Sequence, residues 1–509
     1  MCLHYGQPLN DTQPRPDIVL AAINAKWIHP SFALRLLKAN LGDLEHRCRI
    51  MEFALRQGEA EKVNPILAAC PRILGLSVSI WNHKDTLNLL KALYEKRGLH
   101  PRVILGGPEV SRLPEDAEIF HYADYVIRGE GEEAFRELCK KLLARENKSP
   151  LPKFITPPPP DVSRILSAYD LYGPEDLKRR LIYVESSRGC VFGCDFCQSG
   201  IELSAAGTKV IGKKLREFPL EAFLTDMDRL LGRMGSGNTI KFLDRSFNSN
   251  PGRAVEILNF FLERIKRDAH KNLCVHFEMV PFRFPLELRK ILSQFPFGSL
   301  RVELGIQTLN IAAASLINRA GNAEEALEIL AFLREETKAI VHADLIAGLP
   351  GEDMESLGKG FDRLWNAMTS FSLDRTPSFT FGRTPSFAFG RTTSEEAGAM
   401  EIQLGILKLL PGTPMGRHTL AHAMKYAAEP PYEVIETGVI PGREMNRIKN
   451  YARFWEILVN RNHFPAQISR LLPPGEPVFW RFMELSDRLL ERFGRNWGID
   501  REELRKALH

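Results

Sequence analysis

Three cysteines crowd one short stretch of the sequence, SSRGCVFGCDFCQSG at 186–200. Cys190, Cys194 and Cys197 are too close together, and too few, for a disulfide framework, which uses an even number of separated thiols. A structural zinc site needs a fourth ligand and usually shows two-pair spacing, which is missing here. Three thiolates instead suit three irons of a cubane cluster, whose fourth iron stays open to an external ligand.

The cysteine stretch directly follows the first of six predicted strands, which are separated by helical segments such as 251–268. The strands are expected at 181–186, 239–244, 273–280, 300–307, 339–348 and 401–409. Strands that alternate with helices predict a parallel sheet. Six such units predict a partial TIM-type (β/α)6 barrel, in which chemistry collects at the carboxyl ends of the strands.

The CxxxCxxC pattern, with the aromatic Phe196 before its last cysteine, resembles the radical SAM superfamily. The resemblance implies an enzyme with a 4Fe–4S cluster at Cys190, Cys194 and Cys197 that reductively cleaves S-adenosylmethionine (SAM). It also implies a partner that supplies electrons, such as flavodoxin or ferredoxin. Residues in segments that match the family's pattern are candidates for binding SAM: Phe196, Asp244, Glu278, Glu303, Gln307 and Asp344. Asp244 lies in FLDRSFN, which departs from the Gly-Gly-Glu that is common on the second strand.

An earlier series of strands and helices occupies the first 150 residues. Apolar runs at 17–23, 73–80 and 102–111 are each followed by a helical pattern, and 122–143 closes the series. The pattern predicts an α/β domain of the flavodoxin or Rossmann type. The dinucleotide fingerprint is missing after the first strand, so NAD and FAD are not expected there.

Small residues at the strand ends of this front domain leave room for a large ligand. Together with the pieces GGPEVS and YVIRGEGEEAF, they resemble the cobalamin-binding domain of B12-dependent radical SAM proteins. The resemblance implies a cobalamin site formed by Asn24, Trp27, Ser77, Ser79, Trp81, Gly106, Gly107, Gly129 and Glu130. The cobalt-ligating D-x-H-x-x-G pattern is missing, so His29 is interpreted as a loop or capping histidine. Trp27 and Trp81 could equally be core aromatics.

Domain boundaries follow from these patterns. We expect a cobalamin-binding domain at 1–150, a proline-rich linker at 151–178, the radical SAM barrel at 179–418 and a helical C-terminal domain at 419–509. A near-perfect duplication, RTPSFTFGRTPSFAFGRTTS, marks a mobile insert at 375–393. An Arg/Phe ligand for nucleic acid or a protein is the less favoured interpretation of this insert.

Charge and composition narrow the function classes. A net charge of +5 on 509 residues gives little support for nucleic-acid binding. We expect no membrane segment. The five cysteines outside the cluster motif are scattered and are interpreted as buried thiols, which predicts a cytoplasmic protein.

The favoured function is a cobalamin-dependent radical SAM methyltransferase of class B that acts on an unactivated carbon. The same cofactors would also serve a cyclisation or rearrangement without methyl transfer. A tRNA methylthiotransferase-like enzyme is a third hypothesis, but Cys48 and Cys70 lack the third cysteine that its front domain uses. A non-catalytic cobalamin or iron–sulfur sensor would not need the SAM-side residues. The sequence does not identify the substrate.

Overall fold

A computed structural model describes residues 15–96, 101–144, 151–203, 209–211, 215–235, 237–267, 272–369, 400–473 and 476–508. The chain divides into two compact units. The first contains Met1–Ser186, Ile201–Gly212 and Arg216–Asn238, and the second contains Ser187–Gly200, Lys213–Leu215 and Thr239–His509. The insert predicted at 375–393 lies outside the described residues.

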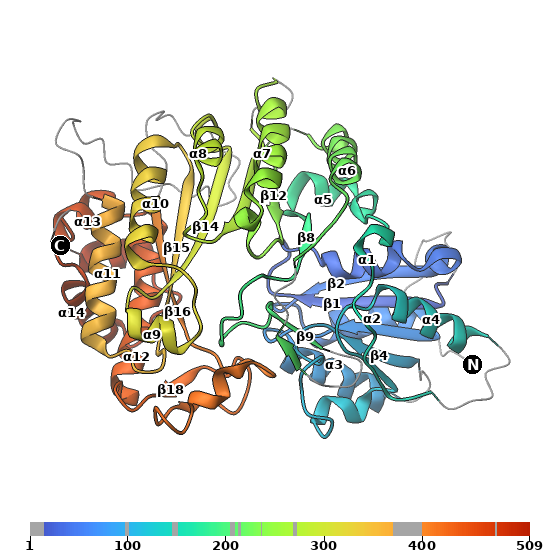
Figure 1. The fold of residues 1–509 in the computed structure, drawn as a ribbon. Coiled ribbons are helices and arrows are strands. Elements are labelled where there is room, and N and C mark those ends of the chain that lie inside the picture. Colours follow the sequence, from blue (N-terminus) through green and yellow to red (C-terminus); the bar gives the residue numbers. More distant parts are fainter. Residues whose placement is uncertain are drawn as a thin grey trace. The chain divides into compact units, whose positions relative to one another are not determined.

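The first unit contains a parallel sheet with the strand order β2-β1-β3-β4-β5-β6. Its strands are β1 (Ile18–Asn24), β2 (Cys48–Ala54), β3 (Ile73–Ser77), β4 (Arg102–Gly106), β5 (Tyr125–Ile127) and β6 (Phe154–Ile155). The helices are α1 (Phe32–Ala39), α2 (Glu59–Ala69), α3 (His83–Glu95) and α4 (Glu132–Leu143), followed by α5 (Pro174–Arg179) and α6 (Leu220–Arg233) (Figure 1). The order 2-1-3-4-5 is that of flavodoxin-like folds, whose ligand end lies where β1 meets β3.

Helices cover both faces of this sheet. Because both faces are buried, the sequence of β1 is an almost continuous apolar run. Val19, Ala21 and Ile23 pack into a core with α2 and α3. Ile18 and Leu20 pack into a second core with α1 and α4. The predicted two-sided α/β fold is therefore confirmed.

The segment predicted as a linker is folded and packs within the first unit. It supplies β6, two 3₁₀ turns and α5. Tyr172 is fully buried, and its hydroxyl donates to the carbonyl of Tyr183 at 2.8 Å. Asp176 pairs with Arg35 at 2.8 Å. The prolines limit regular structure, but these aromatic and charged side chains tie the stretch to the domain.

The second unit contains strands β12 to β16, which are parallel where paired and run in the order β16-β15-β14-β13-β12 (Figure 1). The strands are β12 (Thr239–Phe242), β13 (Cys274–Met279), β14 (Leu300–Gln307), β15 (Ile340–Ala347) and β16 (Met400–Ile406). Between them lie α7 (Pro251–Ile265), α8 (Leu286–Leu292), α9 (Ile311–Leu316), α10 (Ala323–Glu336) and α11 (Met354–Thr369). The first strand predicted in this series is β7 (Ile182–Val184), so all six predicted strands are present.

The C-terminal helices belong to the same compact unit as these strands. They are α12 (Gly442–Trp455), a π-helical turn at Glu456–Asn460, α13 (Pro465–Leu471), α14 (Phe479–Phe493) and α15 (Arg501–Ala507). Phe361 on α11 packs edge-on against Tyr451 and Trp455 of α12, with ring centroids 5.3 and 4.7 Å away. The domain boundary predicted at 418/419 stays a prediction.

The cysteines outside the motif differ in part from the expectation of buried thiols. Cys48 and Cys139 are buried free thiols, whereas Cys70 and Cys274 are partly exposed. None of the helices in the described ranges is long and apolar enough to span a bilayer.

Candidate functional site

The three cysteines of the motif line one cavity of about 160 Å³ in the second unit. Cys194 is buried, while Cys190 and Cys197 are partly exposed. The loop folds back on itself at Gly200, where a Cβ atom would lie 2.1 Å from the carbonyl oxygen of Phe192. Only glycine permits this close return, which brings the thiols to one side of the loop.

Each thiol has a polar neighbour. Ser246 Oγ lies 3.8 Å from Cys190 Sγ, a guanidinium nitrogen of Arg319 lies 3.7 Å from Cys194 Sγ, and the Ser199 N–H donates to Cys197 Sγ at 3.4 Å. Burial raises the pKa of Cys194, and the charge of Arg319 opposes that shift. Hydrogen-bond donors and a positive charge favour the thiolate form that an iron–sulfur cluster needs.

Polar side chains from successive strands line the same cavity. Glu278 comes from β13, Glu303 and Gln307 from β14, and Asp344 from β15. Along β14, apolar residues are buried and polar residues are partly exposed in strict alternation. Glu303 and Gln307 both line the cavity from β14, and register places Glu303 opposite Glu278. The structure thus brings together five of the six predicted SAM candidates, since Phe196 lines the cavity too.

Asp244 is the sixth candidate and does not appear among the cavity-lining residues. It is buried, and its carboxylate accepts a 2.6 Å hydrogen bond from the Ser187 hydroxyl. This contact joins the end of β12 to the start of the cysteine loop. In this structure Asp244 supports the loop.

The carboxylates of the cavity differ in whether neighbouring groups offset the cost of burying their negative charge. Glu303 is 3.0 Å from Lys241 Nζ and 3.2 Å from His276 Nε2. Burial works against ionisation of Glu303, but a hydrogen bond from His276 and the charge of Lys241 outweigh it and hold its pKa well below the usual range. Burial, with the negative charges of Glu303 and Glu278 added, raises the pKa of Asp344 to about 8. Asp344 therefore keeps a proton at neutral pH.

The backbone at the end of β14 is irregular. The pairing register shifts between Gly305 and Gln307, and Gln307 adopts a positive φ of 71°. A Cβ atom on Gly305 would lie 2.6 Å from the side-chain nitrogen Nε2 of Gln307 and 3.5 Å from a guanidinium nitrogen of Arg319. The bulge and the missing side chain let Gln307 and Arg319 reach the cavity together.

Two arginines of the cavity, Arg245 and Arg319, were not predicted from the sequence. Arg245 pairs with Glu278 at 3.2 Å. Arg319 follows α9 in a loop where Asn318 has a positive φ of 50°, and it also donates to the Gly305 carbonyl. Neither residue lies in a periodic segment, so the sequence offered no signal beyond the charge itself.

The ligand end of the first unit is built from short contacts between strand ends. Asn82 donates to the carbonyls of Ile23 and Ser77 at 2.9 and 3.2 Å, and accepts from the Ser79 N–H at 2.7 Å. It therefore ties the ends of β1 and β3 together. Gly107 has φ of 107°, and a Cβ there would lie 2.5 Å from the Val78 carbonyl oxygen.

The predicted cobalamin residues fall into two groups at this end. Ser77, Gly106, Gly107 and Gly129 leave the strand ends small, and a Cβ on Gly129 would meet no atom within 4 Å. Ser79 is buried, Asn24 donates to Glu52 at 3.0 Å, and Glu130 pairs with Arg216. The second group is thus buried or already paired within the protein. In the first group, Gly129 leaves open space for a ligand, whereas Gly107 is closed off by the Val78 backbone.

The aromatic residues at this end are exposed. Trp27 and Trp81 are 51% and 55% exposed, so the alternative that they are core aromatics is wrong. His29 Nδ1 lies 2.7 Å from the Tyr183 hydroxyl, in keeping with the predicted loop role.

Comparison with known proteins identifies both regions. Residues 18–139 match the B12 binding domain, and residues 184–364 match the radical SAM superfamily. An uncharacterized methyltransferase of Pyrococcus horikoshii is 31% identical over 172 residues, 30% of this chain and 36% of its own length. The cobalamin-dependent radical SAM methyltransferase TokK of Streptomyces tokunonensis is 27% identical over 169 residues, 29% of this chain and 25% of its own.

Solved structures share the fold. The cobalamin-dependent SAM radical enzyme OxsB, with aqua-cobalamin and SAM bound, aligns with a TM-score of 0.58 at 14% identity, covering 97% of this chain and 78% of that one. This likeness concerns the fold alone. The chain spans only about a quarter to a third of the length of the first curated relatives it matches.

Proposed function

We propose that this chain, whose residues 18–139 match the B12 binding domain and whose residues 184–364 match the radical SAM superfamily, methylates an unactivated carbon of its substrate. The observation that carries the proposal is the single cavity in which Cys190, Cys194 and Cys197 meet the strand-end residues Glu278, Gln307 and Asp344. When bound, the 4Fe–4S cluster and SAM supply a 5′-deoxyadenosyl radical, and cobalamin supplies a methyl group. A small electron carrier of the flavodoxin or ferredoxin class would provide the electron.

The cavity residues match the polar groups of SAM. In this proposal the guanidinium of Arg319 faces the carboxylate of SAM, since arginine is suited to planar, charge-assisted pairing. The carboxylate of Glu278 and the amide of Gln307 accept hydrogen bonds from the ammonium and ribose groups. Asp344, which keeps its proton at neutral pH, can donate as well as accept. Phe196 supplies an apolar wall.

At the ligand end of the first unit, Ser77, Gly106, Gly107 and Gly129 would let the large cobalamin ring approach the strand ends. Trp27 and Trp81 would cover it, because their rings are exposed where the loops after β1 and β3 begin. His29 is engaged with Tyr183, so we propose that it does not ligate cobalt.

The test uses SAM whose methyl group carries three deuterons. Full-length protein, reconstituted anaerobically with iron, sulfide and cobalamin, is incubated with a chemical reductant and a metabolite extract. Methylation predicts a product that gains the labelled methyl, together with both 5′-deoxyadenosine and S-adenosylhomocysteine. A new product without the label, formed with 5′-deoxyadenosine alone, would identify a rearrangement instead. Absence of 5′-deoxyadenosine in every extract and in its blank would overturn radical chemistry.

A further inference from the structure

Asp195 lies in the cysteine loop, residues 187–200, between Cys194 and Cys197. Its carboxylate is paired with other protein side chains. Its side chain is 1% exposed. Oδ1 accepts a hydrogen bond from the Asn318 amide at 2.9 Å. Oδ2 lies 2.7 Å from His418 Nε2 and 2.7 Å from a guanidinium nitrogen of Arg417. Three side chains from two other parts of the chain, Asn318, Arg417 and His418, thus surround this carboxylate.

The backbone of Asp195 is held as well. Its N–H donates to the Ile317 carbonyl at 2.9 Å, and its carbonyl accepts from the Met415 N–H at 3.1 Å. Three residues later in the same motif, the side chain of Gln198 donates to the Pro411 carbonyl at 2.8 Å. The cysteine loop is therefore fixed at both Asp195 and Gln198.

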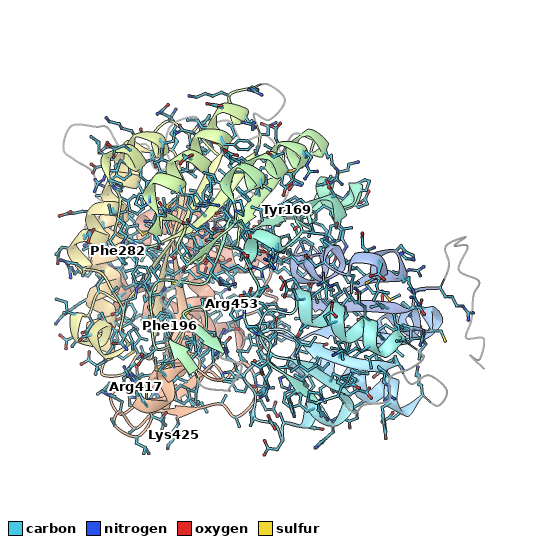
Figure 2. All side chains as sticks on the ribbon, turned by 45° about the vertical axis from the view of Figure 1, so that its right-hand side comes forward. Tyr169, Phe196, Phe282, Arg417, Lys425 and Arg453 are labelled. Carbon is cyan, nitrogen blue, oxygen red and sulfur yellow. The ribbon has the colours of Figure 1, made fainter. Side chains whose placement is uncertain are left out.

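Most of these contacts come from one segment after β16, residues 410–418, which we term the anchor segment. It is a compact turn, closed by the Thr413 hydroxyl, which donates to the Leu410 carbonyl at 2.8 Å. Met415 is fully buried, and His418 is 7% exposed. Figure 2 labels Arg417, whose guanidinium pairs with Asp195, and Phe196, the residue that follows Asp195. The segment lies beyond residues 184–364, which match the radical SAM superfamily.

We propose that Asp195 and the anchor segment position the cysteine loop for the 4Fe–4S cluster, so that cluster retention depends on residues outside the loop. The proposal rests on the cluster assignment within the proposed function. Asp195 acts as a positioning residue, because its two oxygens are engaged by Asn318, Arg417 and His418. A buried carboxylate held by three polar side chains resists reorientation, and it restrains the neighbouring Cys194 through one peptide bond.

The test measures cluster loss from the reconstituted full-length protein. An iron chelator is added under anaerobic conditions, and the decay of the cluster absorbance is followed for wild type and Asp195→Asn. Loss of such a supporting contact is expected to speed iron release roughly 10–100-fold. The EPR spectrum of the reduced cluster without SAM should broaden or split, because the thiolates sample more than one geometry. A merely structural change elsewhere would leave this spectrum unchanged.

His418 gives a second pair of variants in case Asp195→Asn folds poorly. His418→Ala removes one of the two partners of Oδ2 and should speed iron release. His418→Gln can place an amide near the same position and should restore part of the retention. Thermal midpoints of all variants are measured alongside.

Asp362 is the matched control. This carboxylate of the same unit accepts from the backbone N–H groups of Val478 and Phe479 at 2.6 and 2.8 Å and does not line the cavity. Asp362→Asn should release iron at the wild-type rate. If both Asp195→Asn and His418→Ala release iron at the wild-type rate and leave the EPR spectrum unchanged, the proposed positioning role is wrong. Equal acceleration in Asp362→Asn would overturn it too, since it would indicate general destabilisation. Wild-type protein that takes up no cluster would contradict the proposed function instead.

Discussion

The two sheets of this chain place their candidate ligand groups in different ways. In the first unit, both faces of β1 are buried, with the sequence IVLAAIN, because helices cover each side. Ligand groups are confined there to the loops at the strand ends. In the second unit, β14 alternates as LRVELGIQ, and its polar residues share one partly exposed face. A sheet with one open face carries its chemistry along the strands, whereas a sheet covered on both faces carries it only at their ends.

The difference also appears in the kind of residue at each site. The second unit gathers Glu278, Glu303, Asp344, Arg245 and Arg319 around one cavity. The described ligand end of the first unit relies on small residues and on exposed aromatic rings. Charged groups suit a zwitterionic ligand such as SAM, and space with aromatic cover suits a large ring system. Substitutions should therefore act through charge and ligation in one unit and through shape in the other.

The largest expected effect is loss of the cluster thiols. Replacing Cys190, Cys194 and Cys197 together by alanine should abolish the brown chromophore and SAM cleavage, because no other described thiol lines that cavity. Wild type should bind about four irons and four sulfides per chain. Iron and sulfide analysis after anaerobic reconstitution measures this.

Cys274→Ala is the control for that triple variant. Cys274 is a free thiol on β13, and burial raises its pKa. The variant should keep full iron content. If Cys274→Ala loses the cluster while the triple variant keeps it, the assignment of Cys190, Cys194 and Cys197 as cluster ligands is wrong.

A smaller effect, on shape, is expected in the first unit. Gly107→Ala forces a side chain into a positive φ, which costs about 1–3 kcal/mol, and also into the backbone of Val78. It should lower the thermal midpoint and abolish cobalamin binding. Gly129→Ala meets the same conformational strain at φ 91° but no neighbouring atom. It should be the milder change in stability while still weakening cobalamin binding, measured by absorbance titration.

These two variants distinguish an effect on the stability of the fold from an effect on cobalamin binding. If Gly129→Ala binds cobalamin as wild type does, the open space at that strand end is not part of the site. If Gly107→Ala is as stable as wild type, the tight approach to Val78 does not constrain the sheet.

Much of this architecture could be predicted from the sequence, because it depends on local periodicity. The six strands and the three thiols could be predicted from the strand–helix pattern and from the cysteine motif, and Glu303 and Gln307 from the family resemblance. Asp244 was assigned to the cavity because a pattern cannot show that the hydroxyl of Ser187 engages it. Arg319 was missed because its approach depends on a bulge at Gln307 and on the left-handed Asn318. The folded stretch at 151–178 was missed because long-range burial of Tyr172 outweighs its prolines.

An intermediate effect is expected from pH. Below the ordinary Asp pKa of 3.8, folded and unfolded chains both hold the Asp344 proton, and this group does not affect stability. As pH rises towards about 8, the unfolded chain releases that proton and the folded chain keeps it. The unfolded state therefore binds fewer protons, and stability falls with rising pH across this window. Asp344→Asn should remove this loss, which amounts to on the order of 4 kcal/mol between about pH 5 and about pH 8.

Thermal midpoints of cofactor-free wild type and Asp344→Asn at the two pH values measure this effect. Glu352 offers a parallel case outside the cavity, because burial raises its pKa to about 7 although Thr308 donates to it at 2.6 Å. Glu352→Gln should show the same sign. If Asp344→Asn changes the thermal midpoint by the same amount at both pH values, Asp344 does not keep its proton in the folded protein at neutral pH.

The smallest effect on stability is expected from the exposed tryptophans of the first unit. Trp27 and Trp81 are each about half exposed, so replacing either with alanine removes little buried area, and surface changes usually stay within about 0.5 kcal/mol. Trp27 loses in addition a contact with Arg180, whose guanidinium lies 5.2 Å from its ring centroid. Cobalamin affinity should nevertheless fall several-fold in both variants, because the rings would cover the corrin. Trp497→Ala, at a 64% exposed position in the second unit, is the matched control and should change neither quantity. Unaltered cobalamin affinity in Trp27→Ala and Trp81→Ala would mean that shape at the strand ends alone forms this site.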